Sequence, residues 1–142
     1  MASNLTSIHD QLKVVLAAVT GVETVSDFPE DYATWEAQAV LPGERLPACH
    51  LRTEPATTVA TTDGDLMETI AVTVRLLIPY KGSAKSVYNT IRDAVITAVY
   101  GDTTLWSLCD NVTPKGTTVE KQEEQLHRIS IEFEIEHIWT PA

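Results

Sequence analysis

The sequence predicts an α+β domain in which a mainly antiparallel or mixed sheet with one extended hairpin carries two main helices on one face. Three patterns support this class: two stretches with apolar residues every three or four positions, stretches with apolar residues at every second position, and an Asp-Gly pair between two β-prone stretches. The chain has 142 residues, a common size for one domain. Residues 1–142 are therefore predicted to fold as one unit.

Two helices follow from the apolar spacing. The first is expected to end at Gly21, which can adopt the backbone conformation that closes a helix. The second follows Ser83, whose hydroxyl can cap it, and ends near Gly101. The stripes predicted to face the core are Leu5, Ile8, Leu12, Val15, Leu16 and Val19 in the first helix and Val87, Ile91, Ala94, Val95 and Ala98 in the second.

Between these helices the sequence predicts a long connection and a short strand. Prolines and a glycine interrupt residues 22–46, leaving room for one helical turn at 32–39. Residues 47–52 are apolar and bounded by prolines, which is typical of a strand. Pro55 is expected to interrupt this strand or to confine it to a sheet edge, because proline cannot donate a backbone hydrogen bond.

An extended hairpin is predicted across Asp63-Gly64. One face of a long strand is predicted from residues at a strict spacing of two, namely Leu66, Glu68, Ile70, Val72, Val74, Leu76 and Ile78. Residues 57–62 before the turn are polar on both faces. Asp-Gly suits a type I′ turn, in which glycine adopts a positive φ without penalty. We therefore expect an exposed turn on a hairpin that reaches beyond the core.

The last third of the chain is predicted to contain a connection and two strands. Leu105 and Trp106 are placed in a connection that Pro114 and Gly116 terminate, with a short strand at 117–120. The closing strand alternates between one buried and one wet face. Its core face is Ile129, Ile131, Phe133 and Ile135, and its wet face is Arg128, Ser130, Glu132, Glu134 and Glu136.

The charge and hydropathy exclude two kinds of partner. The chain holds 20 acidic and 10 basic residues, a formal charge of −10, and such a surface repels phosphate backbones. Specific nucleic-acid binding is therefore not expected. The apolar runs are too short to span a bilayer and no leader-like segment begins the chain, so no membrane contact or export is expected either.

No catalytic, cofactor-binding or metal-binding residues are predicted. The histidines are scattered, and Cys49 and Cys109 lack the spacing of a metal or redox motif. Glu132, Glu134 and Glu136 are expected at a spacing of roughly 6.5–7 Å on one strand face, a separation that glycosidases use. A regular column fits a solvated face better, because active carboxylates need differing surroundings. A small hydrolase that uses one of them is the alternative from another class, and a monomeric ligand-binding module is a further one.

The ordered set of elements resembles the tail terminator, or minor tail protein U-like, family of long-tailed bacteriophages. The resemblance lies in the early amphipathic helix, in residues 46–48 before the first strand, in the long strand 68–78 followed by the helix 86–100, and in the closing strand 127–135. Gly101-Asp102 and the loop with Leu105 and Trp106, between the helix 86–100 and the closing strand, also resemble this family. The resemblance covers nearly the whole chain.

The resemblance implies a virion protein that assembles in the bacterial cytoplasm as a ring, usually of six subunits. Such a ring binds the head-proximal end of the tail tube, stops its polymerisation and presents a surface to a head-completion or neck protein. DNA passes through it without specific binding, and the family has no catalytic residues to carry over. A head-tail connector or tail completion protein is the neighbouring alternative, because such proteins share this size and acidity.

Two surfaces are candidates for contact. Ile96 and Tyr100 lie opposite the core stripe of their helix, so either a neighbouring subunit or a loop of the same chain is expected to cover them. The face with Glu132, Glu134 and Glu136 is expected to be solvated, and it borders either the DNA channel or the outer wall. The outer wall is the preferred place, with the hairpin the stronger candidate for the channel.

Overall fold

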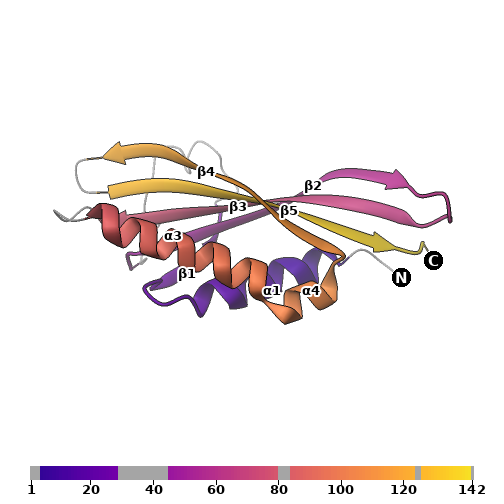
Figure 1. Ribbon diagram of the computed structural model, residues 1–142, viewed down its shortest axis with the longest axis horizontal. Helices are drawn as coiled ribbons and strands as arrows, with labels where there is room; N and C mark the ends of the chain where they lie inside the picture. Colours follow the sequence, from indigo (N-terminus) through magenta and orange to yellow (C-terminus); the bar gives the residue numbers. More distant parts are fainter. Residues whose placement is uncertain (1–3, 29–44, 80–83, 124–125, 142) are drawn as a thin grey trace.

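The computed structural model describes residues 4–28, 45–79, 84–123 and 126–141 (Figure 1). These residues form three helices and one five-stranded sheet. The elements in chain order are α1 (Leu5–Ala17), β1 (Thr24–Asp27), β2 (Ala48–Ala60), β3 (Leu66–Pro79), α3 (Ala84–Gly101), α4 (Thr103–Leu108), β4 (Asn111–Glu123) and β5 (Leu126–Trp139).

The sheet is mixed, with the strand order β1-β2-β3-β5-β4. β1 pairs with β2 in parallel, and every other neighbouring pair is antiparallel. Figure 1 shows the three helices on one side of the sheet, so the predicted α+β class with helices on one face is confirmed. Below, the side of the sheet that carries the helices is called the near face, and the opposite side the far face.

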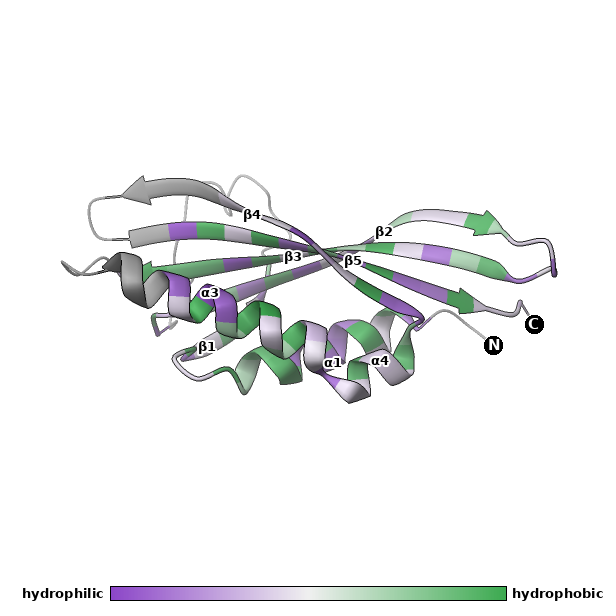
Figure 2. Cartoon of the chain, in the orientation of Figure 1, coloured by the Kyte–Doolittle hydropathy of each residue, from purple (hydrophilic) through white to green (hydrophobic). Residues whose placement is uncertain are grey.

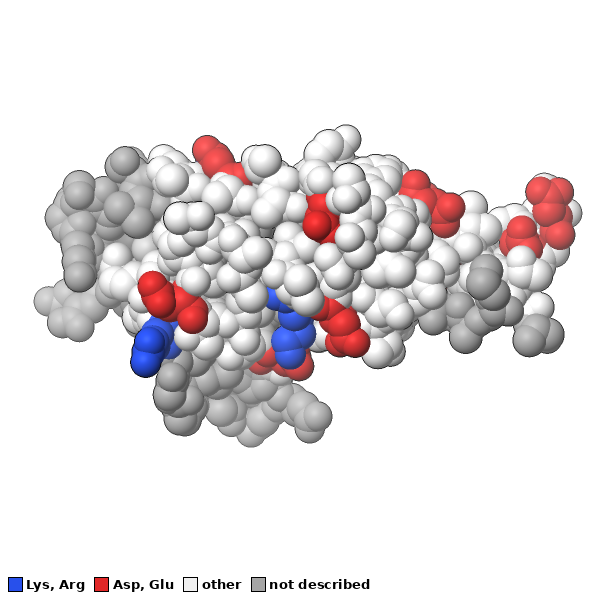
Figure 3. Space-filling view, turned by 90° about the horizontal axis from the view of Figure 1, so that it is seen from below, with Lys and Arg blue, Asp and Glu red and all other residues white. Residues whose placement is uncertain are grey.

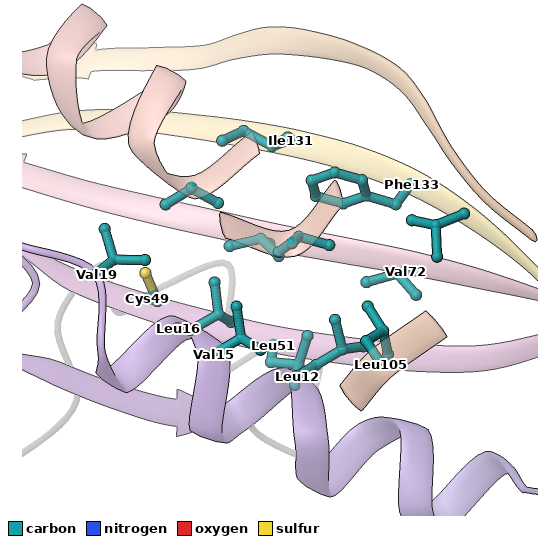
Figure 4. Packing of buried hydrophobic residues seen from close by; sticks show 14 of the residues in the cluster. Leu12, Val15, Leu16, Val19, Cys49, Leu51, Val72, Leu105, Ile131 and Phe133 are labelled. Carbon is teal, nitrogen blue, oxygen red and sulfur yellow. The ribbon is translucent and has the colours of Figure 1, made fainter. Parts of the chain in front are cut away.

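The core lies between the helices and the near face. α1 contributes Ile8, Leu12, Val15 and Leu16, all buried as the spacing predicts, and Figure 4 shows its later residues pointing toward Leu51, Val72 and Phe133 on the sheet. Burial of a side chain of this size contributes roughly 1.5–3 kcal/mol. The periodicity of the helix therefore fixes which of its sides meets the sheet.

α3 packs beside α1 through a stripe close to the predicted one. Ile91, Val95 and Val99 are buried, while Ala94 and Ala98 are partly buried and pack against the same core. Val99 was not in the predicted stripe, although it continues the steps of four from Ile91 and Val95. The predicted cap at Ser83 and the side chain of Val87 lie outside the described residues.

β2 is longer than the predicted short strand, because it continues through Pro55 to Ala60. β1 pairs only with Ala48–Leu51, so from Arg52 onward β2 has no strand on its outer side in the described chain. Proline is tolerated in such an edge segment, and the register shifts between Pro55 and Thr57. Of the two predicted effects of Pro55, the structure confirms the confinement to a sheet edge and not the interruption of the strand.

Two short elements were missed. β1 has only four residues and lies in what was predicted as a connection. α4 occupies the stretch around Leu105 and Trp106 that was also predicted as a loop, and the Asp102 carboxylate caps it by accepting a hydrogen bond from the Leu105 backbone N–H at 2.8 Å. β1 and α4 are both too short to show the regular spacing of apolar residues by which a strand or a helix is recognised in a sequence. The helical turn predicted at 32–39 lies outside the described residues.

β4 also corrects the prediction. Pro114 and Gly116 were expected to end a connection, but β4 runs through both and pairs with β5 over its length. The register shifts between these two residues, which is a β-bulge. β4 is the last strand of the sheet, so its outer edge tolerates the missing proline donor.

The β2–β3 hairpin carries Asp63 and Gly64 at its exposed turn, and Figure 1 shows this hairpin and the end of β5 reaching beyond the helices. Gly64 has a φ of +85°, while no described residue other than glycine has a positive φ. The Gly64 N–H donates to the Thr61 carbonyl at 3.3 Å, and the Thr61 N–H donates to the Asp65 carbonyl at 2.8 Å. The turn is therefore a three-residue loop with glycine in the left-handed region, and the predicted type I′ turn was wrong.

Replacing Gly64 with valine is expected to destabilise the domain by about 1–2 kcal/mol, because a β-branched residue is strained at this φ. Urea unfolding measures the difference. Gly101→Ala is the matched control, since Gly101 lies in α3 without a positive φ and has open space where the new methyl group would be. A Gly64→Val protein as stable as the wild type would contradict the strained turn.

Candidate functional site

One end of the far face is buried, contrary to the predicted wet face. His50, Arg75 and Ser130 lie in register across β2, β3 and β5, and all three are buried. Arg128, on the same face, is also only 6% exposed. Alternation along a strand assigns a residue to a face but does not say what covers that face, so the sequence pattern could not reveal this burial.

The other part of the far face is open and carries the predicted glutamates. Glu132 is exposed, whereas Glu134 and Glu136 are half-buried. The Lys115 ammonium on β4 lies 3.4 Å from a Glu134 carboxylate oxygen, a distance typical of an ion pair. The structure therefore places all three glutamates along one strand, on the side away from the core.

A shallow hollow of about 230 Å³ lies beside these glutamates. Its floor is the far side of β3, where the side chains of Thr69, Ala71 and Thr73 are small, and Glu132 and Glu134 stand along its β5 side. The hollow exists because the central strand has no long side chain to fill the space between its neighbours. This is also where the hydrolase alternative would place its carboxylates.

An apolar row follows on the part of the sheet beyond the helices, called here the arm (residues 57–70 of the β2–β3 hairpin and 135–139 of β5). Val59 pairs with Met67, which pairs with Ile138, so the three side chains lie side by side across three strands. Val59 and Ile138 are exposed and Met67 is half-buried. Figure 2 shows the apolar colouring at the ends of these strands. The sequence alone does not predict this row, because only the pairing register brings the three side chains together.

The outer side of the helical layer is a second open surface. Val14 on α1 is 61% exposed and Tyr100 on α3 is 51% exposed. Two neighbouring hollows of about 430 and 410 Å³ lie between α1 and α3 and share Thr97 and Ala98. Their walls are mainly small side chains, so this surface is apolar and shallow. Val14 could have been found from the sequence, because it falls outside the core stripe of α1.

The two predicted interface residues have different surroundings. Ile96 is partly buried and packs against the core, so it does not lie opposite the core side of α3 as expected. The Tyr100 ring meets Trp106 of α4 edge to face at 5.8 Å, and the Trp106 indole N–H donates to the Tyr100 carbonyl at 2.6 Å. The same chain therefore covers Ile96 and one side of Tyr100, and it leaves the rest of the Tyr100 ring open.

A carboxylate, an imidazole and a hydroxyl group meet where α1 crosses the sheet. His9 Nε2 lies 2.7 Å from Asp27 Oδ1, and His9 Nδ1 lies 2.7 Å from the Thr53 hydroxyl. Because an ionised carboxylate only accepts, Nε2 donates its hydrogen to Asp27, and Nδ1 pairs with the Thr53 hydroxyl. Lys13 Nζ lies 3.6 Å from the same Asp27 oxygen. The group links α1 to β1 and β2, three segments far apart in the sequence, and no local motif could have predicted it.

Other reactive groups are separated in the described part of the chain. No cluster of three or more metal-binding side chains occurs among residues 4–28, 45–79, 84–123 and 126–141. Cys49 and Cys109 are buried and not joined. Burial, reinforced by the Asp110 carboxylate, raises the pKa of the Cys109 thiol to about 11, so this thiol stays protonated and unreactive at neutral pH. No described helix has the length and apolar character needed to cross a bilayer.

Comparison with known proteins assigns no family to the chain. No protein-family model matches its sequence, and no curated protein sequence matches it. We therefore infer a function from the open surfaces and from the order of helices and strands along the chain.

Proposed function

We propose that the chain is a structural subunit of a phage virion that forms a ring on the head-proximal end of the tail tube. The ring, of six subunits, stops polymerisation of the tube and offers a surface to a head-completion or neck protein. The order of helices and strands along the sequence supports the tail terminator assignment. The outer side of the helical layer carries the argument for assembly.

A helix that faces water is expected to be polar on its outer side. Here α1 and α3 instead expose Val14 and Tyr100, with the two apolar hollows between the helices. Apolar side chains and apolar hollows on an outer helical surface are candidates for contact between proteins. A neighbouring subunit that covered it would remove this surface from water and so favour assembly.

Two edge segments of the sheet, namely β4 and the part of β2 beyond its pairing with β1, are poorly suited to joining subunits. The free edge of β2 contains Pro55, that of β4 contains Pro114, and each strand has a register shift beside its proline. Prolines and bulges disrupt the row of donors that another strand would need. Association through the helical side is therefore favoured over a sheet that continues between subunits.

The acidic surface agrees with a conduit for DNA. Asp63 and Asp65 lie at the turn of the hairpin, and Figure 3 shows acidic atoms at this end of the molecule. Carboxylates repeated around a ring would keep phosphate groups from binding to its wall. We place the hairpin toward the channel in this proposal, with DNA passing without specific contacts.

Negative-stain imaging of the pure protein, alone and mixed with tail tubes, tests the proposal. We expect rings that cap tube ends and tubes that stop growing when the protein is added. Tubes that grow unchanged and carry no cap would contradict the tail terminator assignment. Caps that remain bound only when a head-completion protein is present would favour the connector or completion alternative.

Variants of the helical side test how the subunits meet. Val14→Asp is expected to abolish rings while leaving the unfolding midpoint nearly unchanged, because Val14 is mostly exposed in the single subunit. Tyr100→Asp is also expected to abolish rings, and it should lower the midpoint slightly because the ring contact with Trp106 is lost. Ile96 is unsuitable for this purpose, since a charge there would enter the core. Thr117→Asp, on exposed β4, adds the same charge elsewhere and should still form rings. Rings formed by both helical variants would rule out this contact.

A further inference from the structure

We propose that the open part of the far face binds a basic, partly apolar segment of a different protein. The binding surface consists of the hollow beside Glu132 and Glu134 together with the apolar row Val59, Met67 and Ile138. This inference goes beyond the ring proposal and does not rest on it, because the surface lies on the opposite side of the sheet from the helices.

The hollow and the apolar row are continuous along the sheet. Met67, Thr69, Ala71 and Thr73 are alternate residues of β3 and so point to the same face. Met67, in the apolar row, lies two residues before Thr69, where the floor of the hollow begins, and this spacing corresponds to roughly 6.5–7 Å along the strand. An extended segment of a few residues can place one side chain over the apolar row and its following side chains beside the hollow.

The open part of the far face carries more carboxylates than cations, which favours a cationic partner. Glu132 and Glu136 have no cation within 4.0 Å among the described residues, whereas Glu134 has Lys115. Glu54 on β2 also lies on this face and is paired with Arg52. The carboxylates thus exceed the available cations, and lysine or arginine side chains from a partner would complement the excess.

A second copy of the chain is a poor partner for this surface. Four of its described cations already lie within 4.0 Å of carboxylates of the same chain, so a second copy has few free cations to offer this acidic surface. These pairs are Lys13 with Asp27, Arg52 with Glu54, Arg92 with Asp93 and Lys115 with Glu134. The structure therefore favours a basic segment from another protein over a symmetric contact.

A fluorescently labelled peptide of alternating lysine and valine is the probe, and fluorescence anisotropy measures its binding to the full chain. We expect binding that weakens as salt is added, because exposed charges are screened. A peptide of alternating glutamate and valine is the matched control and should not bind. Equal binding of both peptides, or no binding of the lysine peptide at low salt, would overturn the proposal.

Two sets of variants locate the contact. Changing Glu132, Glu134 and Glu136 together to glutamine is expected to lower the affinity at least tenfold and to flatten its dependence on salt. The control removes the same charge from the helical side, with Asp10→Asn, Glu23→Gln and Asp93→Asn combined, and should change the affinity less than threefold. An equal loss in both triple variants would show a general charge effect and would overturn the assignment to this face.

The apolar row has its own test. Met67→Ser combined with Ile138→Ser is expected to weaken binding about fivefold without changing its salt dependence, since no charge is altered. Unchanged affinity in this variant would remove the row from the binding surface. The molar mass of each sample separates the two proposals. A monomer that binds the peptide contradicts only the proposed ring. A ring that does not bind the peptide contradicts only the proposed binding surface.

Discussion

Replacing Phe133 with alanine is expected to lower the free energy of unfolding by about 3–5 kcal/mol, one of the two largest effects in the domain. Phe133 lies on the near side of β5, is 2% exposed and is one of the largest fully or nearly fully buried side chains. Its loss removes apolar area and leaves a cavity beneath the helices. Urea unfolding, followed by far-UV circular dichroism, measures the change.

The neighbouring residue provides the control. Glu134 points to the open far face, so Glu134→Ala should alter the stability by less than about 0.5 kcal/mol, with only an exposed ion pair to Lys115 lost. If Glu134→Ala were as damaging as Phe133→Ala, the two faces of β5 would be assigned the wrong way round.

Truncating Arg75 to alanine is the second large effect, a loss on the order of 3–4 kcal/mol. Arg75 is fully buried at the far face, in register with His50 and Ser130. The change removes one of the largest fully buried side chains and leaves a cavity among its neighbours on β2 and β5. Arg75→Lys keeps the charge and most of the length, so it should destabilise the domain less.

The same unfolding experiment compares the two substitutions. An alanine variant as stable as the wild type would show that this end of the far face is open to water, as the alternation of β5 first predicted. The ordering of the two variants is informative as well, because a planar guanidinium that donates in two directions cannot be replaced fully by an ammonium group.

The elements that sequence reasoning found are those long enough to show a period. α1, α3, β3 and β5 each repeat their apolar positions several times, and every such repeat reports the same buried side. β1 and α4 are shorter than the windows in which a period can be recognised. The cap on α4 by Asp102 is visible in the sequence only once the helix is known to start there.

Proline and glycine misled the prediction where a strand lies at an edge. Pro55 was predicted to interrupt its strand or to confine it to a sheet edge, and Pro114 was predicted to terminate a connection. Both prolines instead lie within strands, β2 and β4, at edge segments where a missing backbone donor is tolerated. Which strands are outermost depends on the order of the whole sheet. That order is a tertiary property, and local sequence does not contain it.

Candidate surfaces were predicted only where one element defines them. Glu132, Glu134 and Glu136 share a strand, so alternation alone placed them on one face. The row Val59, Met67 and Ile138 requires the register of three strands, and the link between His9 and its partners requires three separate elements. Tyr100 was found from the helical wheel, but its contact with the following helix was not.

The most direct test of the proposed function is a cryo-electron microscopy reconstruction of tail tube ends formed in the presence of the protein. We expect a closed ring of six subunits at the end of the tube, with Val14 and Tyr100 at the contact between neighbours and the acidic hairpins toward the channel. A bare tube end, or a ring whose helical sides face solvent all around, would contradict it.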